Sequence, residues 1–439
     1  MSSERLVIFF GNIVHCSEQF KIHIIENGFV MVLENKIMEV NEESAFEEAK
    51  ARLNITKHNN IEEIRLKKSQ ILIPGLIDTH IHAPQYPNSG LGYDKLLLEW
   101  LDTYTYKLEK KYKDQDFSKK VFDAVVRKTL DHGTTTACYF ASLYSNSSLL
   151  LVDSVITHGQ RALVGKINMT TLAPEDYIET PSESIINTKN FIKDVTSKKN
   201  DLVQPIITPR FALSVDMNLM KELGSIAKEQ EVPIQTHISE NVDEIKMVKE
   251  KYNMSYAETY DKADLLTTKT ILAHGVYLSD DELKLLANRG TSIAHCPESN
   301  TCLKSGLCDV RRLQAAGVKV GLGTDVSGGP SASIIQAMKA ALDVSIHIFF
   351  QKENYTPLNF EDVFYLATLG GAEALALENK IGNFEVGKDF DALIIDMDVE
   401  NSSSDYLLEC SPSEILQKFI YLGDDRNVTN VFVAGRRVK

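Results

Sequence analysis

The 439-residue sequence contains little cysteine and no long apolar run. Its six cysteines include no C-x-x-C pair, which argues against a disulfide framework and a structural zinc knuckle. Free thiols in a large chain are typical of a reducing compartment, so we expect a cytoplasmic protein. The opening stretch "MSSERLVIFFGNIVHC" carries Glu4 and Arg5 beside a short apolar run, which is unlike a signal peptide. No run approaches the roughly 20 apolar residues that span a bilayer.

Positive charge is also scarce, because 47 Lys and Arg stand against 61 Asp and Glu and leave a net charge of −14. A chain this acidic is a poor candidate for binding a nucleic-acid backbone or an anionic membrane surface. A small, neutral substrate fits better, although the charge serves mainly solubility. Hydrophobic residues make up 43% of the chain, which is enough for the core of one large barrel and a smaller module.

The pattern of apolar residues changes twice along the chain. Residues 1 to about 68 show short strand patterns, separated by turn signals such as Glu26-Asn27-Gly28, and residues from about 384 to the end return to that texture. Between them, eight apolar strand patterns alternate with amphipathic helical stretches, and the first strand is expected over residues 72–82. The pattern predicts an α/β protein with a (β/α)8 TIM-type barrel over 69–375. Residues 1–68 and 376–439 are expected to form one small, discontinuous β-sandwich.

Polar side chains end five of the predicted barrel strands, at the edge where barrel enzymes place their active sites. His80 and His82 end the first strand and point to the same side, because side chains in a strand alternate. The later strand ends carry Arg210, His237 with Glu240, His274 and Asp325. A single histidine after a strand is more often a core or surface residue, and we assign six others to that class: His15, His23, His58, His132, His158 and His347. Accident is a poor explanation for five candidate ligands at strand ends, so we predict a metal site.

Imidazoles with one carboxylate suit Zn²⁺, although Fe²⁺ or another transition ion fits the same ligands. The candidate ligands are His80, His82, His237, His274 and Asp325. Such an ion lowers the pKa of a bound water from 15.7 toward about 7, which favours hydrolysis. Glu240 lies three residues after His237 and suits a proton shuttle between water and substrate, and Asp325 could also take a proton. The sequence leaves open whether His274 is a ligand or a hydrogen-bond donor.

The H-x-H, His, His and Asp set resembles the amidohydrolase superfamily over nearly the full chain. It is similar to the mononuclear subtype, because the fourth strand, "QPIITPRFALS", lacks the bridging lysine of dinuclear members. The resemblance therefore implies one metal ion per chain. The unrelated cytidine-type zinc deaminases use H-x-E with P-C-x-x-C, and neither pattern occurs in place here.

Within the superfamily, "DTHIHAPQY", "LLLEWLDTYTY", "TPRFALS", "THISEN" and "GLGTDVSGG" resemble the guanine deaminase family. "HAPQY" and "PRF" are more selective than H-x-H, and the resemblance implies that Gln85, Arg210 and Phe211 bind the base. Guanine offers both acceptors and donors, which matches a forked Arg210 and an amide that can donate and accept. Trp100 is expected to pack on the flat ring beside Phe211, and His237 is expected to contact substrate as well as metal.

Each base-site assignment has a plainer alternative. Arg210 could pair only with a structural carboxylate, and Trp100 could be ordinary helix packing. His295 and Asn300, in "AHCPESN", could shape the pocket or only the loop, and Cys296 is not expected to be a ligand.

The resemblance implies hydrolysis of guanine to xanthine and ammonia by a homodimer. In this mechanism Glu240 protonates a ring nitrogen and then passes a proton to the leaving amine, while His274 helps to stabilise the tetrahedral intermediate. Three alternatives remain. Another heterocycle could be the substrate (an adenosine derivative, cytosine or a triazine), but Gln85 and Arg210 argue against it. A non-catalytic scaffold would be expected to lose ligands, and a purine carrier would not need Glu240 beside a metal.

Overall fold

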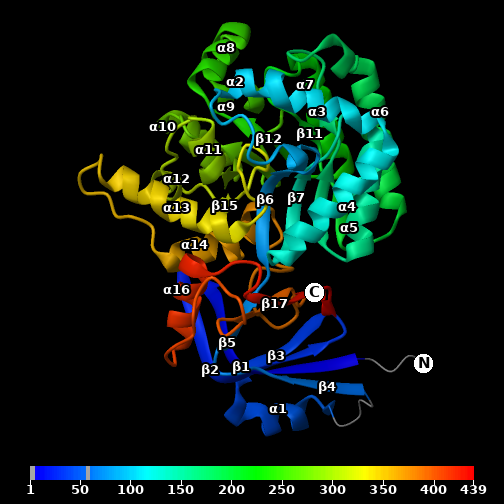
Figure 1. Ribbon diagram of the computed structural model, residues 1–439. Coiled ribbons are helices and arrows are strands. Elements are labelled where there is room, and N and C mark those ends of the chain that lie inside the picture. The colour runs from blue at the N-terminus through cyan, green and yellow to red at the C-terminus, as the bar shows by residue number, and fades with distance from the viewer. Residues whose placement is uncertain (1–4, 56–59) are drawn as a thin grey trace.

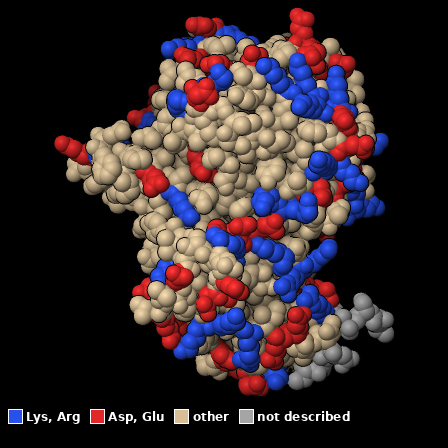
Figure 2. All heavy atoms as spheres, in the orientation of Figure 1, with Lys and Arg blue, Asp and Glu red and all other residues tan. Residues whose placement is uncertain are grey.

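The computed structural model describes residues 5–55 and 60–439, so His58 and Glu4 lie outside the described residues. A barrel of strands and helices stands on a sheet that contains both ends of the chain (Figure 1). Charged residues of both signs are interspersed on the face seen in Figure 2, around a broad uncharged area on the barrel. Within the described part of the chain, no helix is both long and apolar enough to cross a bilayer.

Eight strand positions form the barrel. Their strands are β6 (Leu76–His82), β7 (Thr134–Phe140), β8 (Arg161–Gly165) with β9 (Ile167–Asn168), β10 (Val203–Pro205) with β11 (Thr208–Pro209), β12 (Ile234–Ile238), β13 (Thr270–His274), β14 (Ser292–His295) and β15 (Val320–Leu322). Parallel pairing joins β6, β7, β8 and β10, and separately β12 to β15. A parallel bridge between Ile207 and Ile234 links the two groups, and the Asp325 N–H donates to the His80 carbonyl at 2.8 Å across the last gap. These contacts close the predicted barrel.

Helices surround the barrel strands (Figure 1). They are α4 (Gln115–Asp131), α5 (Ser145–His158), α6 (Pro181–Ser197), α7 (Met217–Gln230), α8 (Val242–Tyr252), α9 (Tyr256–Asp261), α10 (Asp280–Arg289), α11 (Pro297–Cys302), α12 (Val310–Ala315), α13 (Ile334–Phe349), α14 (Phe360–Ala367) and α15 (Leu369–Ala374). Local sequence sets their ends, as α10 shows. Ser279 and Glu282 form a capping box at its start, and Gly290 ends it in the left-handed region at φ +69°.

Strands from both termini form one hydrogen-bonded sheet. Its members are β1 (Arg5–Glu18), β2 (Lys21–Leu33), β3 (Lys36–Glu42), β4 (Asn60–Arg65), β5 (Gln70–Pro74), β16 (Ala392–Asp396), β17 (Val428–Val433) and β18 (Arg436–Arg437). β5 pairs antiparallel with β16, so residues more than 300 positions apart are neighbours. The ring of Phe9 lies 4.7 Å from that of Phe390 and 5.1 Å from that of Phe432, within a buried apolar cluster. Two helices, α1 (Phe46–Arg52) and α16 (Pro412–Leu422), pack on this sheet.

The prediction of one strand over residues 72–82 is wrong, because the segment divides at Gly75. β5 belongs to the terminal sheet, and β6 enters the barrel. A Cβ on Gly75 would lie 2.0 Å from the Thr135 hydroxyl oxygen, so the chain passes between the two sheets where no side chain fits. Apolar residues continue on both sides of this break, so the sequence pattern did not reveal it. The amino ends of the barrel strands thus face the terminal sheet, and the carboxyl ends face away from it.

Candidate active site

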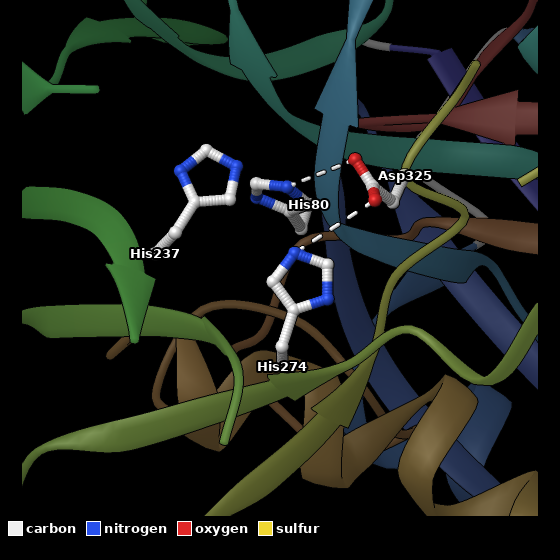
Figure 3. A group of neighbouring side chains, drawn as sticks. All are labelled: His80, His237, His274 and Asp325. Carbon is white, nitrogen blue, oxygen red and sulfur yellow. Dashed lines mark ion pairs between the residues drawn. The ribbon is translucent and has the colours of Figure 1, made fainter. Parts of the chain in front are cut away.

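Four buried side chains meet at the carboxyl ends of the barrel strands, as Figure 3 shows. They are His80 at the end of β6, His237 in β12, His274 at the end of β13 and Asp325 after β15. One ligand atom from each lies within 4.8 Å of all the others. The Nε2 atom of His80 lies 3.2 Å from one Asp325 oxygen, and that of His274 lies 3.8 Å from the other. This group could hold a metal ion.

His82, the fifth predicted ligand, lies beside this group. Its Nε2 atom is 3.1 Å from Nε2 of His237 and 3.4 Å from an oxygen of Asp325. All five candidate ligands predicted from the strand ends are therefore brought together.

The hydrogen bonds behind these side chains leave their inner nitrogens free for a metal. The Nδ1–H of His237 donates to the Arg210 carbonyl at 2.5 Å, and that of His274 donates to Oδ1 of Asn300 at 2.9 Å. Each bond orients one ring so that Nε2 presents a lone pair to the centre, as metal-binding imidazoles do. Among the described residues, Nε2 of His80 is buried and makes no hydrogen bond, although it lies 3.2 Å from an Asp325 oxygen. An orphaned nitrogen, two oriented imidazoles and one carboxylate fit a transition-metal ion.

Burial also sets the charge of these groups. Burial first, and the neighbouring imidazoles second, lower the pKa of His82 and His237 well below the ordinary value. Both rings are therefore neutral at pH 7, which is the form that binds metals. Burial alone would raise the pKa of Asp325, but the adjacent His80 lowers it overall, so Asp325 stays ionised.

Two site residues occupy strained backbone conformations. His274 has φ +79° and Asp325 has φ +46°, a region that costs non-glycine residues about 1–3 kcal/mol. Hydrogen bonds hold the turn at Asp325, where the Gly329 N–H donates to its carbonyl at 2.7 Å. Next to it, Thr324 donates to Asp78, whose pKa burial raises to about 7. The strain arises because the backbone must turn sharply at the end of a strand to direct each side chain toward the centre of the barrel.

Glu240 lies at the edge of the metal-ligand group. Its side chain is buried, with one oxygen 3.4 Å from Nε2 of His274 and the other accepting from the Ser305 hydroxyl at 3.0 Å. Burial, and next the charge of Asp325, raise its pKa to about 8. A carboxyl group whose pKa lies near neutral can both take up and release a proton, as acid–base catalysis requires. The predicted shuttle residue is therefore placed beside the candidate metal group.

A pocket of about 40 Å³ opens beside Glu240. Its lining includes the predicted base-binding side chains Gln85, Trp100, Arg210, Phe211 and His237. Trp100 lies in α2 (Leu97–Trp100), is 2% exposed, and its indole N–H donates to the Leu91 carbonyl at 2.9 Å. It therefore faces the pocket as well as packing in its helix.

The structure also shows the alternative considered for Arg210, which is pairing with a buried carboxylate. Its guanidinium binds Glu109 of α3 (Tyr106–Glu109) through two nitrogens, at 2.6 and 3.2 Å. The amide of Gln85 donates to the same carboxylate at 2.9 Å, and its oxygen accepts from the Ser327 N–H at 3.3 Å. Arg210 thus pairs with Glu109 and lines the pocket at the same time.

Three residues of the site were missed by the sequence analysis: Glu109, Glu244 and Ser305. Glu109 lies in a stretch rich in Lys and Glu, where nothing distinguishes it from surface charge. Glu244, in the first turn of α8, accepts from the Glu240 N–H at 2.7 Å. Acidic residues are common in the first turn of any helix, so the sequence did not distinguish Glu244. Asn300 was named as a pocket or loop residue, and its bond to His274 places it behind the metal-ligand group.

Comparison with known proteins was consistent with this geometry. The family model described as "Amidohydrolase family" matches residues 71–438. Guanine deaminase of Dictyostelium discoideum is 44% identical over 448 residues, with 100% of both chains covered, and that of Homo sapiens is 44% identical over 440 residues, with 98% of this chain and 96% of the human chain covered. A crystal structure of guanine deaminase from C. acetobutylicum, with bound guanine in the active site, superposes with a TM-score of 0.90 at 35% identity and covers 99% of this chain and 100% of its own. The chain therefore belongs to the amidohydrolase family, and within it resembles the guanine deaminases over its whole length.

Proposed function

We propose that this protein is a guanine deaminase, which hydrolyses guanine to xanthine and ammonia. The observation that carries the proposal is the buried acid Glu240, which lies between a metal-ligand group and a pocket lined by Arg210 and Gln85. The full-length similarity to guanine deaminases from Dictyostelium discoideum and Homo sapiens supports the same substrate.

We propose one Zn²⁺ per chain, with Fe²⁺ as the other ion that the same donors fit. The proposed ligands are His80, His82, His237 and Asp325, with His274 beside them. When bound, such an ion would lower the pKa of the attacking water and polarise the reacting group. The neutral imidazoles and the ionised Asp325 are the protonation states that this role needs.

In the proposed reaction, the oxygen of water forms a bond to the ring carbon that carries the exocyclic amine. Glu240 takes a proton from the water and delivers it to the adjacent ring nitrogen. Glu240 then takes the second proton of the same water, from the hydroxyl now bound to the ring carbon, and passes it to the amine. The carbon–nitrogen bond breaks as the carbonyl forms, and ammonia leaves. The proton is necessary because an amide anion is too poor a leaving group. The Ser305 and Glu244 contacts hold the Glu240 side chain and backbone in place for both transfers.

The base is proposed to face Arg210 and Gln85 with its recognition edge and the metal ligands with its reacting carbon. Two of the five N–H groups of Arg210 are used by Glu109, which leaves others for acceptors of the base. Gln85 retains one N–H and one oxygen lone pair for an edge that both donates and accepts. Phe211 and Trp100 supply apolar surface for the flat ring.

We also propose a cytoplasmic homodimer. Six free cysteines, four of them buried, suit a reducing compartment. Phe349 and Phe350 are 49% and 72% exposed at the end of α13, a surface that a second copy of the chain could cover. Sedimentation of the purified protein, beside a Phe350→Ser variant, would test this: a dimer that the substitution weakens is expected, and a wild-type monomer would exclude it.

The enzyme proposal is tested by ammonia release from guanine, with adenine, cytosine and adenosine run in parallel on metal-loaded protein. Release from guanine alone is expected. Release only from another base would keep the hydrolytic chemistry and show that the roles of Gln85 and Arg210 are wrong. Absence of both bound metal and ammonia would leave the scaffold and carrier alternatives.

A further inference from the structure

We infer that Glu109 is the positioning residue of the base pocket, which fixes the Arg210 and Gln85 side chains and neutralises the arginine, so that the pocket accepts a neutral purine and rejects an anionic one. The inference rests on the proposed function and deepens it. It assigns charge selectivity to a residue that does not itself face the reacting atoms.

Glu109 is saturated with hydrogen bonds. Its side chain is 1% exposed. One oxygen accepts from Gln85 at 2.9 Å and from Arg210 at 3.2 Å, while the other accepts from Arg210 at 2.6 Å and from the Tyr177 hydroxyl at 2.8 Å. An ionised carboxylate offers about four lone-pair sites, and all of them are taken. Glu109 therefore acts on the substrate only through its neighbours.

These bonds determine which atoms face the base. The Gln85 amide gives one N–H to Glu109 and accepts the Ser327 N–H on its oxygen, so a flipped amide would lose both bonds. The Arg210 guanidinium is held in plane by the two-point contact, in the fork geometry typical of arginine–carboxylate pairs. Without Glu109, both side chains would keep their donors but lose their orientation.

The pair also sets the charge of the pocket. Burial alone would lower the pKa of Arg210, but Glu109 raises it overall, so the guanidinium remains charged and its partner balances that charge. Two neighbours of this ion pair are uncharged: the Tyr106 ring lies 5.3 Å from the guanidinium, and Tyr177 donates to Glu109. The loop that carries Tyr177 is anchored in turn, because Glu179 binds the buried Lys166 at 2.5 Å. An arginine without this carboxylate would present a bare positive charge to the ligand.

The test compares Glu109→Gln with a matched control, Glu282→Gln. Glu282 is also a buried carboxylate, but it caps α10 and bonds the Ala257 and Ser279 N–H groups away from the pocket. The whole metal-loaded enzyme is assayed with guanine, and xanthine is titrated as a ligand below and above the pH at which it loses its first proton. The fluorescence of Trp100, the only tryptophan in the chain and part of the pocket wall, reports xanthine binding without turnover.

In Glu109→Gln we expect KM for guanine to rise by about 10- to 100-fold with kcat changed by less than about threefold, the pattern of lost uniform binding. We expect the xanthine anion to bind at least about tenfold more tightly than it binds the wild type, because an unbalanced Arg210 attracts it. A purely structural role would weaken both ligands. Glu282→Gln is expected to change neither.

The inference would be overturned if Glu109→Gln bound both guanine and the xanthine anion with wild-type affinity. It would also be overturned if the substitution weakened the binding of both ligands equally. If that variant does not fold, Glu109→Asp keeps the charge and shortens the side chain. It is then expected to raise KM for guanine while still rejecting the anion, and gain of anion binding there would also overturn the inference. Absence of ammonia release from guanine by the wild type would refute the proposed function alone, because xanthine binding still tests Glu109.

Discussion

The metal side and the base side of one pocket are built from different parts of the fold. On the metal side, His80, His274 and Asp325 end or directly follow barrel strands. On the base side, Arg210 directly follows β11, Gln85 lies in a short 3₁₀ helix (Ala83–Asn88), Glu109 in a one-turn helix and Tyr177 in another short 3₁₀ helix (Glu175–Tyr177). The metal ligands thus sit on or just after the barrel strands, whereas the partners that hold Arg210 sit on short helical segments outside the strands.

This difference indicates how the two sides keep their geometry. Strand ends are fixed by the hydrogen bonds between barrel strands, so one further hydrogen bond is enough to orient each of His237 and His274. Gln85 and Tyr177 lie outside the strands and lack that support, and on the base side the Glu109 carboxylate with its four hydrogen bonds provides it instead. Loss of a metal-side residue should therefore affect the reaction rate, and loss of a base-side residue should affect binding.

The largest effect is expected from His80→Ala, which removes a proposed metal ligand from the end of β6. Several kcal/mol of lost charge stabilisation corresponds to a fall in kcat of more than about a thousandfold. Metal analysis should show reduced occupancy, while xanthine should still quench Trp100, because the base side is intact. A variant that keeps both its metal and its turnover would contradict the ligand assignment.

Glu240→Gln should separate proton transfer from metal binding. The amide keeps the shape and the contact with Ser305 but cannot shuttle a proton, so kcat is expected to fall by about 10²- to 10⁴-fold. Metal content and KM should remain near the wild-type values. Ammonia release at saturating guanine is the measurement, and a kcat within tenfold of wild type would exclude Glu240 as the shuttle.

Arg210→Lys tests the base side in the same way. Lysine keeps the charge but cannot make the two-point contact with Glu109 and face the base as well, so KM for guanine should rise by about 10- to 100-fold. The metal content and most of kcat should remain. A loss of kcat as large as that of Glu240→Gln would mean that the two sides are not separable as described.

The same division explains how much the sequence could predict. His80, His82, His237, His274 and Asp325 could be predicted because barrel topology brings strand ends together, whatever lies between them. The break of the first predicted strand at Gly75 was not visible, because apolar residues continue on both sides while the change of partner strand depends on distant Asp391 and Thr135. Glu109 was not visible either, since its role is created by three partners from other segments and not by a local pattern.

The smallest effects are expected from two hydroxyl groups, one on each side of the pocket, that donate a hydrogen bond to a buried carboxyl group. Because the two substitutions remove the same chemical group, they compare the two sides most directly. Ser305 donates to Glu240 at 3.0 Å, and Tyr177 donates to Glu109 at 2.8 Å. Each bond contributes about 0.5–1.5 kcal/mol, so its loss should change one kinetic constant by about two- to tenfold. Ser305→Ala should lower kcat at constant KM, and Tyr177→Phe should raise KM at constant kcat.

The control for both variants is Ser154→Ala, which removes a buried hydroxyl in α5 that has no hydrogen-bond partner among the described residues. It should leave kcat and KM unchanged. Steady-state kinetics with guanine distinguishes the outcomes: a change in KM from Ser305→Ala, or in kcat from Tyr177→Phe, would show that the two carboxylates are coupled across the pocket. Opposite responses to the loss of the same chemical group would instead locate rate control on the metal side of the pocket and recognition on the base side.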